Sequence, residues 1–298
     1  MTSFLNFNRF YFKKSKYYYI IKLVIKLQRY FSKQKIDDTF ILNADDCYHI
    51  KTVMRMSNGD NIEVVCEEIP YLCEINNIES NIKIKIIKEL DTANDKMPYI
   101  TILIPILKEQ KMDYILQKAT ELGVSEIIPV IMERSIVKVN EKEAKKLERW
   151  SRIVKEASEQ SHRNTIPKIN KIEKINTLNL NGLNLVCSTV EKQNTIKKVF
   201  KNNCNYDKIN MLIGPEGGIS PKEEEILINN GFIPVSLGNR IMRVETVPLY
   251  LMSIINYEYM EWWYVKYIVK YKYKWWSYFN SFMHNFIDYT FNCNFYYC

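Results

Sequence analysis

The sequence predicts a small barrel-like β domain followed by an α/β domain with a mostly parallel sheet. Between residues 28 and 95, short β-rich runs alternate with turn signals such as Asn58-Gly59-Asp60. From Pro98 onward, strands alternate with helices, which is the pattern of a parallel sheet. The length of 298 residues suits about two domains, at roughly 150 residues each.

The individual elements follow from hydrophobic periodicity and turn signals. In the first domain we expect strands at 39–42, 61–66 and 81–87, a helix at 45–56 and a linker at 91–97. The run 99–107 is nearly all apolar, as expected for a strand buried on both faces, and a helix from Lys108 ends at Gly123. The alternation continues with a strand at 126–132, a helix at 141–161, strands at 184–188 and 209–213, a helix at 221–230, a strand at 232–237 and a helix from about Glu245.

The composition is that of an ordinary globular chain. Hydrophobic residues make up 47% and charged residues 26%, which is enough apolar side chain to form cores. No run approaches 18 uninterrupted apolar residues, so we expect no membrane-spanning helix. The 7 cysteines are odd in number and match no zinc or redox spacing. They therefore predict free thiols in a reducing compartment and no metal site.

The net charge of +8 comes from the two ends of the chain, and the body from 37 to 260 is slightly acidic. Residues 1–27 form an atypical basic extension without acids, and we interpret them either as an organelle-targeting peptide or as translated flanking sequence. Residues 261–298 form a tail that contains 17 of the chain's 39 aromatic residues. These are either stacking platforms for single-stranded nucleic acid or, as we expect, outside the fold, because their spacing is irregular. Because the positive charge lies at the ends, it is poor evidence that the folded body binds RNA, and only motifs can indicate RNA binding.

The segment 213–220 (IGPEGGIS) is the first candidate site. It lies between a buried strand and a helix that has strong start signals, with Ser220 as N-cap and Glu223 completing a capping box. Open α/β sheets bind ligands at the carboxyl ends of their strands, and the three glycines let backbone approach a ligand closely. Neither G-x-G-x-x-G nor G-x-x-x-x-G-K-[ST] occurs, which disfavours nicotinamide and nucleoside-triphosphate enzymes.

Two further segments carry polar side chains of interest. In 236–246, Arg240 and Arg243 lie beside a glycine loop at the carboxyl end of a strand, so they are candidates for contacts with anions or bases. In 156–163 (EASEQSHR), Gln160 and Arg163 share a helical face, which an ordinary polar surface also explains. We expect His162 to be a surface residue rather than a catalytic base, and His49, in the first domain, has no nearby nucleophile candidate.

Together these segments resemble the RsmE family, the bacterial 16S ribosomal RNA uridine-N3 methyltransferases of the knotted SPOUT superfamily. The resemblance runs from about residue 28 to about residue 261 in the family order. It rests on KATELGVSEIIPVIMERS (118–135), EASEQSHR (156–163), IGPEGGISPKE (213–223), LGNRIMRVET (237–246), Arg29-Tyr30-Phe31, HIKTVMRM (49–56) and NGD (58–60). One departure is Val247-Pro248 where the family usually has Ala; Pro248 is tolerated in a first helical turn.

The resemblance implies an RNA-binding PUA-like β domain at 28–95 and a SPOUT methyltransferase domain at 98–260 that contains a deep trefoil knot. It also implies an obligate homodimer that acts on 16S rRNA in the small ribosomal subunit. The expected location is the cytoplasm, or a mitochondrion or plastid if residues 1–27 are a genuine targeting segment. The implied cofactor is S-adenosyl-L-methionine, held by Gly214, Pro215, Glu216, Gly217, Gly218, Leu237, Gly238, Ile241 and Met242.

The implied reaction moves the sulfonium methyl group to N3 of a uridine, and the N3 proton must leave. Arg243 is the first choice for stabilising the charge that develops on the uracil oxygens, and Arg163 is a weaker choice. Glu245 is a candidate proton acceptor, although a position at a helix start suits a structural role equally well. The residues expected to contact RNA are Arg29, Arg55, Arg134 and Gln160.

Two rival functions remain open at this stage. The chain could be a related knotted methyltransferase that acts on another RNA or another atom. Alternatively, it could be a non-catalytic RNA-binding factor whose cofactor pocket has decayed, although the intact glycines of both loops argue against decay.

Overall fold

The computed structural model describes residues 27–77, 82–92, 97–137, 143–202 and 206–259. The predictions for the tail at 261–298 and, apart from residue 27, for the extension at 1–27 lie outside this part of the chain. The chain forms two compact units, one of residues 1–93 with 149–167 and the other of residues 94–148 with 168–298.

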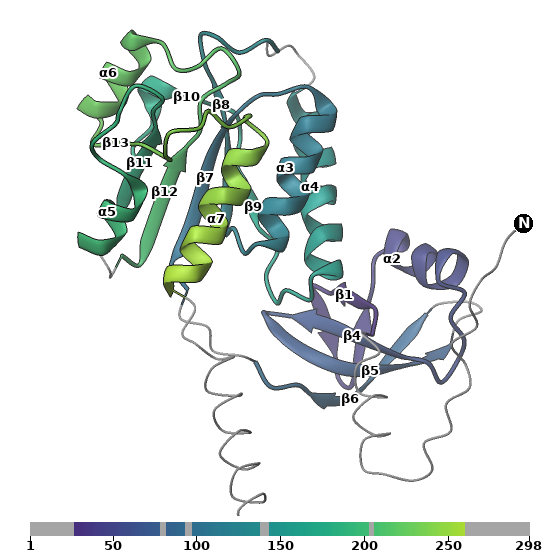
Figure 1. The fold of residues 1–298 in the computed structure, drawn as a ribbon. Helices are drawn as coiled ribbons and strands as arrows, with labels where there is room; N and C mark the ends of the chain where they lie inside the picture. Colours follow the sequence, from purple (N-terminus) through teal and green to yellow (C-terminus); the bar gives the residue numbers. More distant parts are fainter. Residues whose placement is uncertain (1–26, 78–81, 93–96, 138–142, 203–205, 260–298) are drawn as a thin grey trace, which may run out of the picture. The chain divides into compact units, whose positions relative to one another are not determined.

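The first unit contains a six-stranded sheet in the order β1-β4-β5-β6-β3-β2, in which β1 runs parallel to β4 and the other neighbours are antiparallel (Figure 1). Alternate side chains such as Tyr30, Ile62 and Ile84 form its core. The strands are β1 (Arg29–Phe31), β2 (Gln34–Ile36), β3 (Thr39–Ile41), β4 (Asn61–Cys66), β5 (Ile69–Asn77) and β6 (Lys83–Glu89).

The helix expected at 45–56 is interrupted. It consists of α2 (Ala44–Tyr48), capped by the Asn43 side chain, followed by a π-helical turn η1 (His49–Val53). The β-branched pair Thr52-Val53 has low helix propensity, which is consistent with an early end. Shortly after this turn, Arg55 has a left-handed φ of 51°, a conformation that is uncommon for a residue other than glycine.

A buried charge cluster joins α2 to helix α4 (Glu143–Gln160), whose residues from Arg149 onward belong to the first unit. The ammonium group of Lys155 contacts the carboxylates of Asp46 and Glu159, the latter at 2.8 Å. Burial raises the pKa of Glu159 to about 7, although the neighbouring Lys155 favours its charged form. The carboxyl group therefore titrates near neutral pH in the folded protein.

This raised pKa predicts a pH-dependent stability. Relative to an unfolded carboxyl group with a pKa near 4.5, folded Glu159 binds its proton more tightly, so its contribution is fully present below that pH and is lost as the pH rises through about 7. We expect Glu159→Gln to gain thermal stability over the wild type between about pH 5 and about pH 8. Thermal unfolding at a series of pH values measures this, with exposed Glu89→Gln in the same unit as the control. A stability difference that does not change with pH contradicts the raised pKa.

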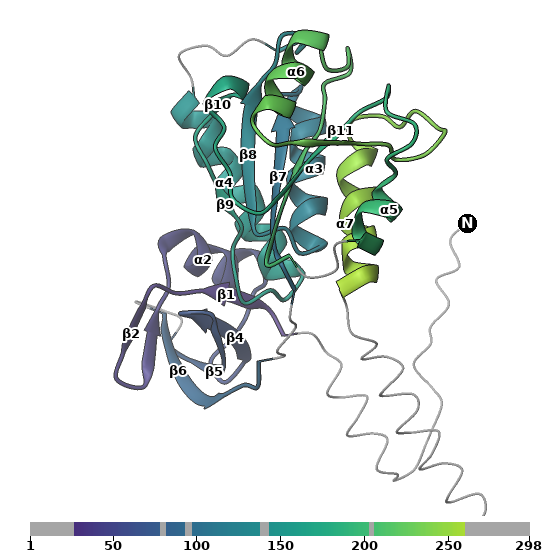
Figure 2. The ribbon, with the colours of Figure 1, turned by 90° about the vertical axis from the view of Figure 1, so that its left-hand side faces the viewer.

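The second unit contains a seven-stranded sheet in which every pairing is parallel (Figures 1 and 2). The order is β10-β8-β7-β12-β11-β13, with β9 also paired to β8. The strands are β7 (Tyr99–Pro105), β8 (Glu126–Ile131), β9 (Lys168–Ile169), β10 (Glu173–Lys174), β11 (Leu183–Cys187), β12 (Lys208–Leu212) and β13 (Ile233–Val235). The predicted α/β class with a parallel sheet is thus confirmed.

Helices cover this sheet. They are α3 (Glu109–Glu121), the start of α4, α5 (Ile196–Asn202), α6 (Pro221–Asn229), α7 (Thr246–Tyr259) and the 3-10 turn η2 (Ile175–Thr177). Helices α3 and α7 contact each other, and Asn256 of α7 donates a hydrogen bond to the Leu122 carbonyl at the end of α3. A second layer packs Leu227 of α6 and Ile175 of η2 against Val130 and Leu212 of the sheet.

None of the described helices is long and apolar enough to cross a membrane. Within the same described residues, no group of three or more His, Cys, Asp or Glu side chains is placed to hold a metal ion. The four cysteines there, Cys47, Cys66, Cys73 and Cys187, are free.

The start of α6 forms the expected capping box and has an additional partner. The Ser220 hydroxyl accepts from the Glu223 N–H, and Glu223 Oε2 accepts from the Ser220 N–H at 3.1 Å. Glu223 Oε1 also accepts from the Glu133 N–H at 2.6 Å. One buried carboxylate therefore fixes two segments, the loop before α6 and the stretch after β8.

Removing this carboxylate predicts a loss of stability. An amide at Glu223→Gln directs its NH₂ group at one of the two backbone donors, so we expect a loss of about 1–3 kcal/mol in the free energy of unfolding. Denaturant unfolding measures the loss. The exposed neighbour Glu225 supplies the matched control, Glu225→Gln, which should change little. Equal stability of the two variants contradicts the double role of Glu223.

Candidate active site

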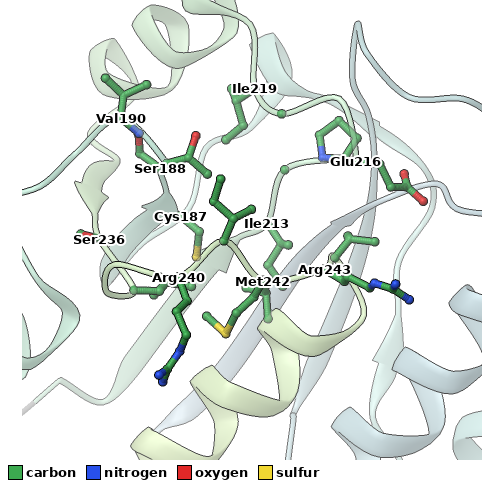
Figure 3. Close-up of a pocket in the computed structure, with 18 of the residues that line it drawn as sticks. Cys187, Ser188, Val190, Ile213, Glu216, Ile219, Ser236, Arg240, Met242 and Arg243 are labelled. Atoms are coloured by element: carbon green, nitrogen blue, oxygen red, sulfur yellow. The ribbon is translucent and has the colours of Figure 1, made fainter.

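Three loops at the carboxyl ends of β11, β12 and β13 surround a cavity of about 470 Å³ in the second unit (Figure 3). This volume is within the range of about 300–1,000 Å³ that small-molecule sites occupy. The loops comprise residues 188–192, 213–219 and 236–244. Two of them are the predicted candidate segments. The third follows β11 and was not predicted, because it contains no glycine or other motif.

Packing inside the protein explains two glycines of the 213–220 loop. A Cβ atom on Gly214 would lie 2.8 Å from Ile219 Cγ1, and one on Gly217 would lie 3.0 Å from Arg134 Cβ. Gly218 has a left-handed φ of 75°, which favours glycine. Gly217 does not line the cavity, whereas Gly214, Pro215, Glu216 and Gly218 do. The glycines of this loop therefore serve packing inside the protein as well as access to a ligand.

Arg134, expected to contact RNA, braces this loop. Its Nη1 atom donates to the Gly217 carbonyl at 3.2 Å and to the Ile219 carbonyl at 3.5 Å. The residue is exposed, so contacts with the loop leave part of its guanidinium at the surface.

The 236–244 loop presents backbone and two arginines to the cavity. Gly238 has a φ of 115°, and no atom lies within 4 Å of the place where a Cβ would stand. Leu237, Gly238, Ile241 and Met242 all line the cavity, and Ile241 is 87% exposed. The structure gathers these predicted cofactor residues, Gly217 excepted, around one space.

Arg240 and Arg243 leave the loop in different directions. Figure 3 shows Arg243 extending on the side where Glu216 lies, whereas Arg240 points away from it. Both residues line the cavity and both are exposed. The two arginines therefore serve different places, and only Arg243 lies on the Glu216 side.

Two unpredicted groups stand near the cavity. The Ser188 hydroxyl accepts from the N–H groups of Val190 and Glu191, which shapes the third loop. Burial raises the pKa of the Cys187 thiol to about 12, so this cysteine remains a neutral thiol rather than a nucleophile. The strand predicted at 184–188 could have pointed to this loop, because parallel strands end at the same edge of the sheet and the other two loops lie at that edge.

Lys111 of α3 is the other residue that sequence reasoning missed. Its Nζ atom lies 2.9 Å from Glu216 Oε1 and 3.5 Å from Glu245 Oε2. Burial raises the pKa of Glu216, but the hydrogen bond and ion pair with Lys111 outweigh it and leave that pKa below the ordinary value. Glu245, proposed above as a proton acceptor, pairs with Lys111 and does not line the cavity.

The other predicted residues, Arg29, Arg55, Gln160 and Arg163, belong to the first unit. Arg29 is buried, and its guanidinium bonds to Glu63, to the His162 carbonyl at 2.6 Å and to the Asn164 side chain at 2.7 Å. Its guanidinium is thus directed into the protein, where it fixes the segment that carries Arg163.

The remaining predicted residues and the two histidines of the first unit differ in exposure. Burial lowers the pKa of Arg163 to about 10, and its Nη2 atom donates to the Thr165 hydroxyl at 3.3 Å. Arg55 and Gln160 are exposed. The imidazole Nδ1 of His162 lies 3.0 Å from Glu63 Oε2, and that of His49 lies 3.0 Å from the Tyr30 hydroxyl.

Comparison with known families defines the class of this fold and site as an RNA methyltransferase. The family described as "RNA methyltransferase domain" matches residues 94–256, and "RNA methyltransferase PUA domain" matches residues 42–89. More narrowly, the chain belongs to the ribosomal RNA small subunit methyltransferase E family, the RsmE family of the sequence resemblance.

Two relatives and two solved structures illustrate this membership. The Bacillus subtilis member is 34% identical over 78% of this chain and 97% of its own, and the Mesomycoplasma hyopneumoniae member is 32% identical over 76% and 98%. The Neisseria gonorrhoeae member, solved bound to S-adenosyl methionine, is 30% identical with a TM-score of 0.70 over 78% of this chain and 97% of its own. A Legionella pneumophila protein solved with the same cofactor is 26% identical with a TM-score of 0.72 over 78% and 98%.

Proposed function

We propose that this protein transfers the methyl group of S-adenosylmethionine to N3 of a specific uridine in 16S rRNA of the small ribosomal subunit. The observation that carries the proposal is the three-loop cavity, which gathers eight of the nine predicted cofactor residues in a chain whose relatives are small-subunit rRNA methyltransferases. Two structures of similar fold were solved with S-adenosylmethionine bound.

The residues around the cavity fit this cofactor. The left-handed backbone at Gly238 leaves open space where a side chain would stand, so main-chain groups are accessible to a ligand. Apolar side chains of Ile213, Leu237 and Met242 suit the adenine ring. When bound, S-adenosylmethionine supplies a methyl group that its sulfonium already activates.

The protein's own contribution is then positioning and electrostatics. As the uridine N3–H proton leaves, negative charge develops on the uracil oxygens. Arg243 lines the cavity with an exposed guanidinium and is the residue that we assign to this charge. Arg163 remains the weaker choice, and the exposed Arg55 and Gln160 are the candidates for RNA contacts in the first unit.

Further properties of the family belong to the same proposal. We propose domains at 28–95 and 98–260, a barrel-like closure of the first, a trefoil knot in the second, and a homodimer. The exposed Tyr250 and Tyr257 on α7, together with Ile241, support a contact with a second copy. Free cysteines in the described residues support a reducing compartment such as the cytoplasm; the organelle alternative depends on residues 1–27.

Primer extension on assembled small ribosomal subunits tests this function. A methyl group on N3 blocks Watson–Crick pairing, so reverse transcriptase should stop beside the modified uridine only when protein and S-adenosylmethionine are both present. Intact cofactor binding without a stop redirects the search to another RNA. Absence of both the stop and the binding favours the non-catalytic RNA-binding factor.

A further inference from the structure

One lysine links two of the three cavity loops. Lys111 projects from the first turn of α3, its ammonium group bonded to Glu216 in the loop after β12 and paired with Glu245 at the junction of the 236–244 loop and α7. The two loops leave different strands, so this contact ties segments that the backbone does not join directly.

The helix that carries Lys111 gives it a fixed base. The next residue, Met112, is fully buried, as are Ile115 and Leu116 one turn further along. Helix α3 packs on α7, the helix that begins immediately after Glu245. A lysine on a packed helix can hold the two loops more accurately than a loop residue can.

The charges make the contact necessary. Glu216 and Glu245 approach the same nitrogen atom, so their carboxylates lie close enough to repel each other when no cation stands between them. The hydrogen bond with Glu216 raises the pKa of Lys111, so the ammonium stays charged at neutral pH. Because the lysine side chain is 36% exposed, we expect a small effect on global stability and a local effect on the loops.

We propose that Lys111 is a positioning residue that holds the Glu216 and Glu245 loops in the geometry that binds the cofactor, with Glu245 as its anchor and not as the proton acceptor. This inference rests on the proposed function in one respect: it takes the cavity to be the site of S-adenosylmethionine.

The first test compares Lys111→Met, Lys111→Arg and the control Lys118→Met in the full-length protein. Lys118 lies on the same helix and pairs with Glu121, away from the cavity. Calorimetry should show about tenfold weaker S-adenosylmethionine binding for Lys111→Met, near-normal binding for Lys111→Arg and no change for the control. In turnover, KM for the cofactor should rise more than kcat falls.

A double-mutant cycle separates the two roles of Glu245. If it acts through Lys111, adding Glu245→Gln to Lys111→Met should weaken binding little further, because the interaction is already lost. If Glu245→Gln instead abolishes methyl transfer in the Lys111→Met background while binding is unchanged, Glu245 is the proton acceptor and the proposal is wrong.

Amide hydrogen exchange without cofactor makes the test independent of activity. Lys111→Met should speed exchange in both 213–220 and 237–246, whereas Lys118→Met should not. Unchanged exchange in both loops overturns the proposal. A wild-type protein that binds cofactor but methylates no ribosomal RNA contradicts the proposed function instead, and leaves the exchange and binding results to decide the role of Lys111.

Discussion

Replacing Arg243 by alanine is expected to lower methyl transfer about 100- to 1,000-fold while S-adenosylmethionine binds almost as well as to the wild type. Removing the proton from N3 of a uracil leaves negative charge on its oxygens, and a guanidinium that lines the cavity can stabilise that charge. The loss should appear in kcat. Single-turnover transfer to small ribosomal subunits, with calorimetry of cofactor binding beside it, measures the two effects separately.

Arg240→Ala is the matched control for this prediction. Arg240 belongs to the same loop, is also exposed and also lines the cavity, but it points away from the side where Glu216 lies (Figure 3). We expect a much smaller loss from its removal. Full activity of Arg243→Ala with normal cofactor binding disproves the assignment. Loss of cofactor binding together with activity shows instead that the Arg243 side chain contributes to the cofactor site itself.

Elements with a strong local signal were predictable from the sequence. The apolar run of β7 and the helical stripe of α3 lie within a few residues of their predicted positions. Strand β5 was missed because Pro70 and the polar residues Glu74, Asn76 and Asn77 dilute its β character. Strands β9 and β10 have two residues each, which is too short for any periodicity.

The candidate site likewise contains residues that the sequence predicted and residues that it did not. Glycine loops between a strand and a helix have a local sequence signal, so two walls of the cavity were predictable. The 188–192 loop and Lys111 have none, because their importance depends on which strand lies beside which. The buried position of Arg29 was equally hidden, since its partners His162 and Asn164 lie more than a hundred residues away in the chain.

Gly238→Ala is expected to weaken S-adenosylmethionine binding about 10- to 100-fold with only a modest loss of stability. The φ of 115° is one that residues with a side chain rarely adopt, so the loop must shift to relieve the strain. A methyl group at this position also enters open space that no protein atom fills within 4 Å. The two effects act in the same direction, because both alter the wall that the cofactor contacts. Calorimetric titration measures the affinity.

Gly231→Ala separates backbone strain from damage to the site. Gly231 also has a left-handed φ, of 82°, and nothing lies within 4 Å of its missing Cβ, but it follows α6 and does not line the cavity. Strain alone should therefore lower the melting temperature of both variants while cofactor affinity falls only in Gly238→Ala. If both variants bind equally well, open space at Gly238 is not part of the cofactor site. If both bind equally poorly, affinity reports the general stability of the second unit, and the loop around Gly238 has no special role.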